Sequence, residues 1–227
     1  MGQPTKTILF LGATGGCGLS VLRRSLAAGH TCIALCRTPS ALLTKLALPS
    51  APPNLTLHTG NAHDPDAVFA KLTIDDPHVC EMGMATLLGA IARRRAETGN
   101  TGWRPRVLVL SSTGLTSVGT RDTPLLMVPL YRGLLEVSRA DKKAMEELLV
   151  REGRDERWTI VRPSLLTDGV EGGGVVRVGV EDPGEGRLER SEVGYTISRE
   201  DVGKWGFEEL IEEGEARWLS KAVGLTY

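Results

Sequence analysis

Short apolar runs alternate with amphipathic segments along most of this chain. The apolar runs have the length and composition of buried strands, and they lie at residues 7–11, 31–36, 55–58, 106–112, 158–163, 175–180 and 218–225. Segments with apolar residues at helical spacing lie between most of them, at residues 16–28, 65–72, 73–97, 124–136, 139–151 and 199–213. Strands that alternate with helices predict an α/β fold with a mostly parallel sheet and helices on both faces.

One part of the chain departs from this alternation. The helical segment that starts at Pro65 is followed directly by a second one, for which Asp76 is the predicted N-cap. A doubly wound α/β domain would place a further apolar strand between these two helices, and the sequence offers none there. We therefore expect a sheet that lacks one of its usual strands.

Length and composition narrow the class of protein. The 227 residues suit a single domain, residues 1–227, and with only 4% aromatic residues its core must be mainly aliphatic. The 27 basic and 28 acidic side chains leave a formal charge of −1, which argues against a nucleic-acid partner. No apolar run reaches the roughly 18 residues of a membrane span, and the N-terminus lacks the plan of a secretory signal. We expect a cytoplasmic protein without a membrane partner.

The four cysteines do not predict a metal site. Cys17, Cys32, Cys36 and Cys80 form no C-x-x-C pair. Two interpretations stay open, namely buried inert thiols and a redox role. Free thiols of either kind fit a reducing compartment.

The clearest chemical pattern follows the first apolar run directly, in the sequence GATGGCG. Its three glycines have the spacing G-x-x-G-x-x-G between a predicted strand and a predicted helix. Such glycines allow a tight turn, close approach of a pyrophosphate and close helix packing, and the helix N-terminus offers free N–H groups to phosphates. The alternative is a glycine turn that binds nothing. The predicted cofactor-binding residues of this segment are Gly12, Thr14, Gly15, Gly16, Cys17 and Gly18.

The end of the second apolar run indicates which dinucleotide is bound. An NAD site usually has an acidic residue there to bind the ribose 2′-hydroxyl, but this run ends in Arg37, followed by Thr38. A guanidinium attracts a 2′-phosphate, so Arg37 and Thr38 predict NADP(H); the alternative is a solvated arginine. Asn61, after the third run, is predicted to bind the adenine edge or to form a simple Asx turn.

Six sequences together carry a resemblance to a known family: GATGGCG, ALCRTP, GNAHD, LVLSSTG, WTIVRPS and YTISREDVGKW. Through them the chain resembles the atypical short-chain dehydrogenases/reductases, in particular the NmrA-like and NAD(P)H-binding-domain families. The resemblance implies a Rossmann-type doubly wound domain that binds NADP(H), with residues 164–227 forming the substrate-cleft portion. In that family the strand not found here lies beside the first strand. Its loss predicts the strand order 3-2-1-4-5-6, in which residues 106–110 pair directly with residues 7–11.

The resemblance also implies roles for individual residues. Ser111 would lie near the nicotinamide as a cofactor-binding residue, and Pro163 would pass near the carboxamide. Lys142 would hold the nicotinamide ribose, with Lys143 as its rival. Ser112, together with Lys142, is the predicted catalytic residue.

The Tyr-x-x-x-Lys pair of the typical family members is missing, because Ser138 and Arg139 stand four residues before the two lysines. Tyr131 and Tyr195 could enter the cleft from elsewhere or be ordinary structural residues. We expect an NADP(H)-dependent oxidoreductase that moves hydride to or from a small organic substrate, with Ser112 or a water as proton partner. The alternative is a non-catalytic NADP(H)-binding redox sensor or regulator. The sequence does not determine the substrate or the oligomeric state.

Overall fold

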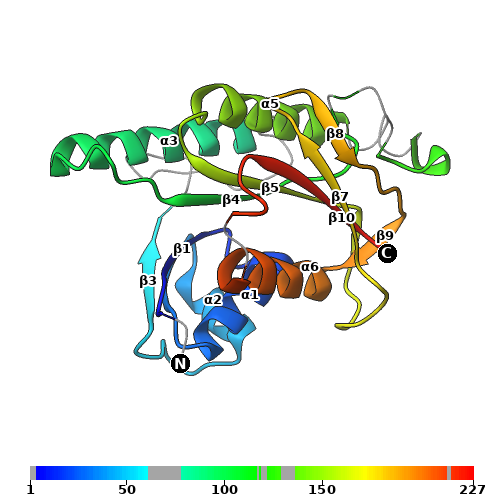
Figure 1. The fold of residues 1–227 in the computed structure, drawn as a ribbon. Helices are drawn as coiled ribbons and strands as arrows, with labels where there is room; N and C mark the ends of the chain where they lie inside the picture. Colours follow the sequence, from blue (N-terminus) through cyan, green and yellow to red (C-terminus); the bar gives the residue numbers. More distant parts are fainter. Residues whose placement is uncertain (1–3, 61–77, 117, 119–121, 129–135, 214–215) are drawn as a thin grey trace. The chain divides into compact units, whose positions relative to one another are not determined.

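The computed structural model describes residues 4–60, 78–116, 118, 122–128, 136–213 and 216–227 (Figure 1). Contacts within the chain define two compact units. Unit 1 consists of Met1–Phe69, Thr167–Gly173 and Ser198–Glu215, and unit 2 consists of Ala70–Leu166, Gly174–Ile197 and Ala216–Tyr227. The assignment of residues 1–227 to one domain stays a prediction.

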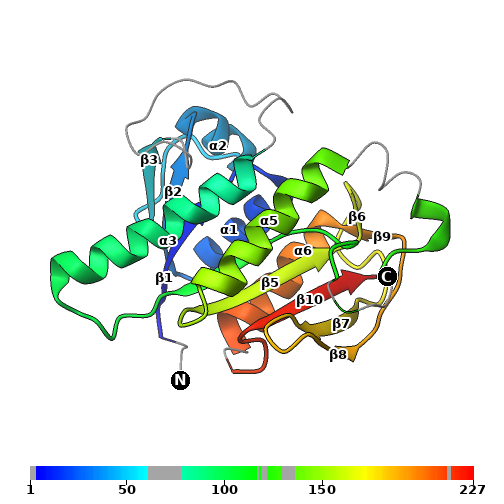
Figure 2. The ribbon, with the colours of Figure 1, turned by 90° about the horizontal axis from the view of Figure 1, so that it is seen from above.

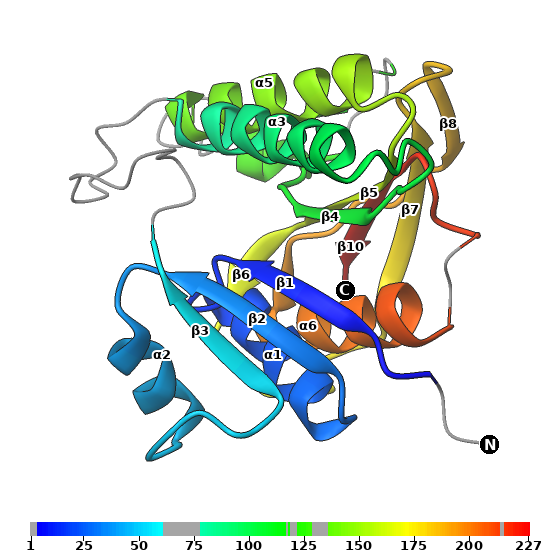
Figure 3. The same cartoon turned by 90° about the vertical axis from the view of Figure 1, so that its left-hand side faces the viewer.

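Unit 1 contains a parallel sheet of three strands in the order β1-β2-β3, which Figure 3 shows side by side. The strands are β1 (Thr7–Leu11), β2 (Thr31–Cys36) and β3 (Leu55–Thr59). The first two match the predicted bounds and the third is one residue longer than predicted. The helices of this unit are α1 (Gly16–Ala27), α2 (Pro39–Leu46), α6 (Arg199–Trp205) and the π-helical continuation η2 (Gly206–Glu213).

The core of unit 1 is aliphatic, as the composition predicted. Leu22 of α1, Leu42 of α2 and Ala34 of β2 are fully buried and pack in one cluster with Phe10. Helix α2 was not predicted from the sequence. Pro39 occupies its first turn, where the ring fixes a helical φ and no N–H is lost, and burial of Leu42 holds the helix on the sheet.

Helices α1 and α6 lie side by side in unit 1 (Figure 1). A Cβ atom on Gly203 would lie 2.2 Å from Ser20 Oγ, and a Cβ on Gly16 would lie 2.3 Å from Arg199 Cδ. The contacts advance by four residues in each helix and in the same direction, so the two helices run parallel with their N-termini at the same end. Glu200 connects them as well, because its carboxylate accepts a hydrogen bond of 2.8 Å from Ser20 Oγ.

Unit 2 contains a sheet of five strands in the order β4-β5-β10-β7-β8. Strands β4, β5 and β10 run parallel, while β7 is antiparallel to β10 and to β8. The bounds are β4 (Arg106–Leu110), β5 (Arg157–Pro163), β7 (Arg177–Asp182), β8 (Arg187–Arg190) and β10 (Lys221–Thr226). A separate pair is formed by β6 (Leu165–Thr167) and β9 (Thr196–Ser198).

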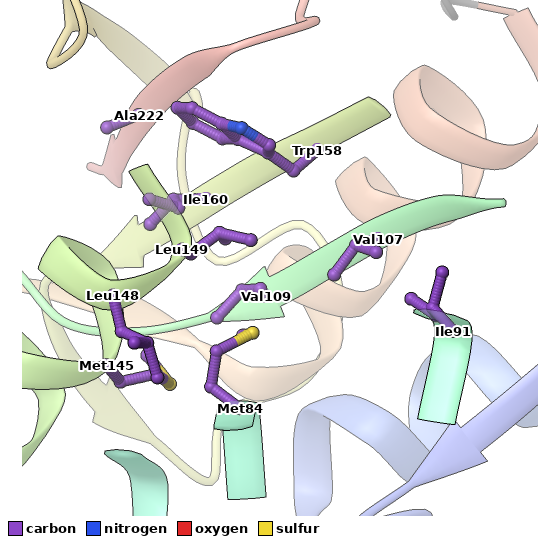
Figure 4. Packing of buried hydrophobic residues seen from close by; sticks show 10 residues of the cluster. All are labelled: Met84, Ile91, Val107, Val109, Met145, Leu148, Leu149, Trp158, Ile160 and Ala222. Carbon is purple, nitrogen blue, oxygen red and sulfur yellow. The ribbon is translucent and has the colours of Figure 1, made fainter. Parts of the chain in front are cut away.

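Two long helices, α3 (Val79–Thr98) and α5 (Glu136–Glu152), lie side by side against this sheet (Figure 2). Their apolar residues pack on β4 and β5 around Leu149 and Ile160, both fully buried, and around Trp158 (Figure 4). Within the described ranges, no helix has both the length and the apolar character needed to cross a membrane.

The N-terminus of α3 is capped from a distant part of the chain. The Asp141 carboxylate on α5 accepts hydrogen bonds from the backbone N–H groups of Cys80 and Glu81, at 2.8 and 3.0 Å. Two of the free N–H groups at the start of α3 are satisfied in this way. Asp76, the predicted cap, lies outside the described residues, as does the predicted helix 65–72.

The predicted strand order is present in part within each unit. The partial order 3-2-1 is found in unit 1, and β4, β5 and β10 are neighbours in that order in unit 2. The predicted pair between residues 7–11 and 106–110 would join a strand of one unit to a strand of the other, and it stays a prediction.

Helix α5 begins at Glu136, three residues before the predicted start of the helix 139–151, and ends at Glu152. In the predicted helix 124–136, the described residues contain the short 3-10 helix η1 (Leu125–Met127) and the helical Val128. Residues 129–135 of that predicted helix lie outside the described part of the chain. Strands β8 and β9 were missed because their sequences are short and charged or mixed.

The close packing of α1 and α6 predicts a specific sensitivity at Gly203. We expect Gly203→Ala to lower the free energy of unfolding by about 1–3 kcal/mol, because the new methyl group would overlap Ser20. Gly89→Ala on α3 is the matched control, since its Cβ would have no neighbour within 4 Å and should leave stability unchanged or raise it by up to about 1 kcal/mol. Urea unfolding of both variants measures the difference, and equal effects would contradict the packing argument.

Candidate cofactor site

The glycine turn between β1 and α1 has the geometry that the sequence predicted. Gly12 has a φ of +86°, and its carbonyl accepts a hydrogen bond of 3.0 Å from the N–H of Gly15. A Cβ atom on Gly18 would lie only 2.8 Å from Gly12 O. The positive φ thus favours glycine at position 12, and the close approach leaves no room for a side chain at position 18. Helix α1 starts immediately behind the turn.

The start of α1 is open to an anion. Its N-cap is Gly15, which provides no side-chain hydrogen bond to the helix, so the first N–H groups have no cap from the side chain of that residue. Free N–H groups and the helix dipole at this end favour a phosphate. Cys17, in the first turn, is buried. The glycine turn and the uncapped start of α1 fit a bound pyrophosphate.

Two basic residues at this turn were missed by the sequence analysis. Lys45 on α2 donates a hydrogen bond of 2.8 Å from Nζ to Thr14 O. The stem of Arg199 covers Gly16. The sequence could not indicate Lys45 or Arg199, because neither has a fixed spacing from the glycines. The packing of α2 and α6 in unit 1 brings them to the turn.

The end of β2 presents Arg37 and Thr38 on the surface. Within the described residues, the Arg37 side chain has no hydrogen bond or ion pair, and Thr38 precedes α2 without using its hydroxyl as a cap. Both side chains are thus available to a ligand. Asn61, the third predicted residue of this region, lies outside the described residues.

In unit 2 the ends of β4 and β5 bring together several of the predicted residues. The N–H of Ser111 donates to Val161 O at 2.7 Å, and the N–H of Thr113 donates to Pro163 O at 3.1 Å. Lys142 Nζ, from α5, lies 3.4 Å from Ser111 O. Parallel pairing of the two strands thus holds Ser111 at Val161 and Thr113 at Pro163, and α5 adds Lys142.

Geometry separates the two lysines that the sequence left as rivals. Lys142 is half-buried against Ser111, whereas Lys143 is exposed and pairs with Glu147 one helical turn away, at 3.8 Å. Ser111 Oγ is buried and has no hydrogen-bond partner in the described part of the chain. A buried hydroxyl without a partner is costly, so this atom fits a site in which a ligand supplies the partner. Ser112 is half-buried next to it.

Tyr195 is 53% exposed and Tyr131 lies outside the described residues, so a role for either tyrosine in place of the missing phenol stays a prediction. Arg139, which stands four residues before Lys143, donates a hydrogen bond to Gly114 O and so stabilises the loop after β4.

A buried ionic cluster borders a small open pocket in unit 2. Arg162 on β5 donates to both oxygens of Glu146 on α5, with the shortest distance 2.6 Å, and to Glu181 on β7 at 2.7 Å. All three side chains are at most 6% exposed. Burial alone would lower the pKa of Arg162, but the two carboxylates more than offset it and the pKa lies above its usual value. Arg162 and Glu181 line the pocket together with Thr113, Asp122 and Arg190.

Two of the cysteines, Cys32 and Cys80, are packing residues with a raised pKa. Burial raises the pKa of Cys32 to about 11, and burial together with the Asp141 carboxylate raises the pKa of Cys80 to about 12. Both thiols are therefore protonated and unreactive at neutral pH. The described residues also contain no group of His, Cys, Asp and Glu side chains suited to a metal ion.

Comparison with known proteins shows the family of this chain. The family model described as NAD(P)H-binding matches residues 12–213, and the chain belongs to this family. It is 39% identical to a reductase, pytE, of Aspergillus terreus, with 100% of both chains covered. It is 36% identical to an oxidase, pynE, of Aspergillus niger, covering 100% of this chain and 99% of that one. The resemblance identified from the sequence is confirmed at the level of the NAD(P)H-binding family.

A solved structure confirms the fold class. A short-chain dehydrogenase/reductase from Veillonella parvula, in complex with NADP, has a TM-score of 0.66 and 17% identity, with 98% of this chain and 94% of that chain covered. The Rossmann-type α/β fold is therefore shared. The alignment to the reductase extends over 273 positions, although this chain has 227 residues, so the relative contains residues that have no counterpart here.

The buried cluster generates a stability prediction. Arg162→Met would leave two buried carboxylates without their cation, and we expect the free energy of unfolding to fall by about 3–5 kcal/mol. Arg93→Met on α3 removes an exposed arginine that pairs with Glu97 at 2.7 Å and should leave the unfolding midpoint close to that of the wild type. Chemical unfolding gives both values. A small effect at Arg162 would show that Glu146 and Glu181 do not depend on its charge.

Proposed function

We propose that this protein is an NADP(H)-dependent oxidoreductase that transfers hydride to or from a small organic substrate. The observation that carries the proposal is the glycine turn, in which the close approach of Gly18 to Gly12 O leaves the start of α1 open to a pyrophosphate. Membership of the NAD(P)H-binding family supports a nicotinamide cofactor. The names of the two Aspergillus relatives, a reductase and an oxidase, support redox chemistry.

Selectivity for NADP(H) rests on Arg37. Its guanidinium is exposed and uncommitted within the described residues, and no acidic residue stands at the end of β2 to bind a ribose 2′-hydroxyl. A guanidinium forms strong charge-assisted hydrogen bonds with a phosphate and gains little from a hydroxyl. Thr38 would add a hydroxyl donor beside it.

Unit 2 would supply the residues that handle the nicotinamide end. A bound NADP(H) supplies the hydride chemistry. Lys142 would bind the nicotinamide ribose. Ser111 would donate a hydrogen bond from its unpaired Oγ to the nicotinamide end of the cofactor, and Pro163 would lie near the carboxamide. Ser112 Oγ, or a water bound to it, would give or accept the substrate proton in place of the missing tyrosine.

The pocket over the Arg162 cluster supports a small-molecule substrate. Its lining comes largely from residues after 164 and combines glycines such as Gly179 and Gly224 with charged side chains. Such a surface favours a polar organic molecule. The free thiols of the four cysteines support a reducing, cytoplasmic setting.

A second candidate function is NADP(H) binding without catalysis, as in a redox sensor. One observation favours it: serine and arginine stand where the typical family members have tyrosine, and Arg139 is engaged with Gly114 O. Incubation of the protein with NADPH and a panel of carbonyl compounds distinguishes the two functions. Binding with consumption of NADPH supports the enzyme, and tight binding without consumption supports the sensor.

Replacement of Arg37 tests the cofactor assignment. We expect wild-type protein to bind NADPH at least about tenfold more tightly than NADH, and Arg37→Asp to reverse this preference, because the carboxylate repels the 2′-phosphate and accepts from the 2′-hydroxyl. Nicotinamide fluorescence titrations give the four dissociation constants. The control is Arg93→Asp, which makes the same charge change on the exposed face of α3 and should leave the preference unchanged. Tighter binding of NADH by the wild type would refute the assignment.

The two neighbouring lysines test the arrangement in unit 2. Lys142→Met should lower the rate of NADPH oxidation by on the order of 100-fold, because the ribose would lose the group that orients it. Lys143→Met removes the same charge from the exposed face of α5 and should retain the wild-type rate. Steady-state kinetics with one active substrate measures both variants. Equal losses would indicate an effect of general charge rather than of position.

A further inference from the structure

Arg199 lies at the N-terminus of α6, on the same side of unit 1 as the glycine turn before α1. It is the first residue of α6, directly after Ser198, whose hydroxyl caps the helix by accepting from the N–H of Asp201 at 2.9 Å. Because α1 and α6 run parallel, their N-termini lie at one end of unit 1. Arg199 is therefore held next to the residues that would bind a pyrophosphate.

The stem of Arg199 lies on the first residue of α1. A Cβ atom on Gly16 would be 2.3 Å from Arg199 Cδ and 3.3 Å from both Cγ and Nε. A side chain at position 16 would displace the Arg199 stem from this position. The contact brings the guanidinium to the open N-terminus of α1, where Lys45 already contributes a second positive charge through its bond to Thr14 O.

The partner of the Arg199 guanidinium is weakly held. Nη1 donates to Asp168 Oδ1 at 2.5 Å, but Asp168 is 92% exposed and has no other hydrogen bond within the described residues. Exposed pairs of this kind contribute little to stability. The other acidic residues nearby have structural tasks: Glu200 binds Ser20 and Arg24, and Asp201 binds the N–H groups of Gly172 and Gly173.

We propose that Arg199 is a further cofactor-binding residue, which binds the pyrophosphate of the dinucleotide at the glycine turn and exchanges Asp168 for it. The inference rests on the proposed function and deepens it, because it assigns a charged ligand to the phosphate site. Arg199 and Arg37 then act on different parts of the cofactor: Arg37 selects the 2′-phosphate, whereas Arg199 contributes equally to NADPH and NADH.

Fluorescence titration with NADPH and NADH tests this division of roles. Arg199→Met retains the stem on Gly16 and removes the charge, and it should weaken both cofactors by a similar factor of about ten or more. Asp168→Asn removes the competing carboxylate and should tighten NADPH binding by about threefold. Lys204→Met is the control, because it removes one positive charge from the same helix at a residue that pairs with Glu171. This variant should bind NADPH within about twofold of the wild type.

The outcomes separate this inference from the proposed function. If the wild type binds NADPH and Arg199→Met binds it equally well, with an unchanged thermal unfolding midpoint, the role of Arg199 is overturned and the proposed function stands. Weaker binding by Asp168→Asn would overturn the exchange with Asp168. Failure of the wild type to bind either cofactor would overturn the proposed function itself.

Discussion

Two close contacts made by glycines determine where helix α1 lies, and the candidate phosphate site depends on both. Gly18 lies so near the carbonyl of Gly12 that a Cβ atom would be 2.8 Å from it, and Gly203 lets α6 pack against Ser20. The first contact places the free N–H groups of α1 directly behind the turn. The second contact aligns α6 with α1 and so brings Arg199 to the same end. Close packing of backbones thus positions the charges that a pyrophosphate needs.

In unit 2 the comparable constraint is the buried charge of Arg162. Two carboxylates from different elements, Glu146 on α5 and Glu181 on β7, surround this guanidinium. A buried ion must have its partners, so the cluster fixes the position of α5 on the sheet. The same helix presents Lys142 to the end of β4, where Ser111 retains an unpaired hydroxyl. Helix α5 therefore carries both Glu146, which belongs to the buried cluster, and the candidate cofactor residue Lys142.

The length of the chain agrees with one expectation from its sequence. The full-length alignment to the Aspergillus terreus reductase extends over 273 positions, whereas this chain has 227 residues. This chain therefore lacks residues that a relative of the same family contains, as the missing apolar run before residue 73 suggested.

The sequence by itself determined the features that depend on neighbouring residues. The apolar runs predicted β1, β2, β4 and β5, and the glycine spacing predicted the turn, because period and turn chemistry are local. Only the tertiary structure decided the contacts between distant segments. Glu200 binds Ser20 across 180 residues, Asp141 caps α3 from α5, and Arg199 covers Gly16. Such contacts follow from how helices and strands pack in space, and no spacing along the chain encodes them.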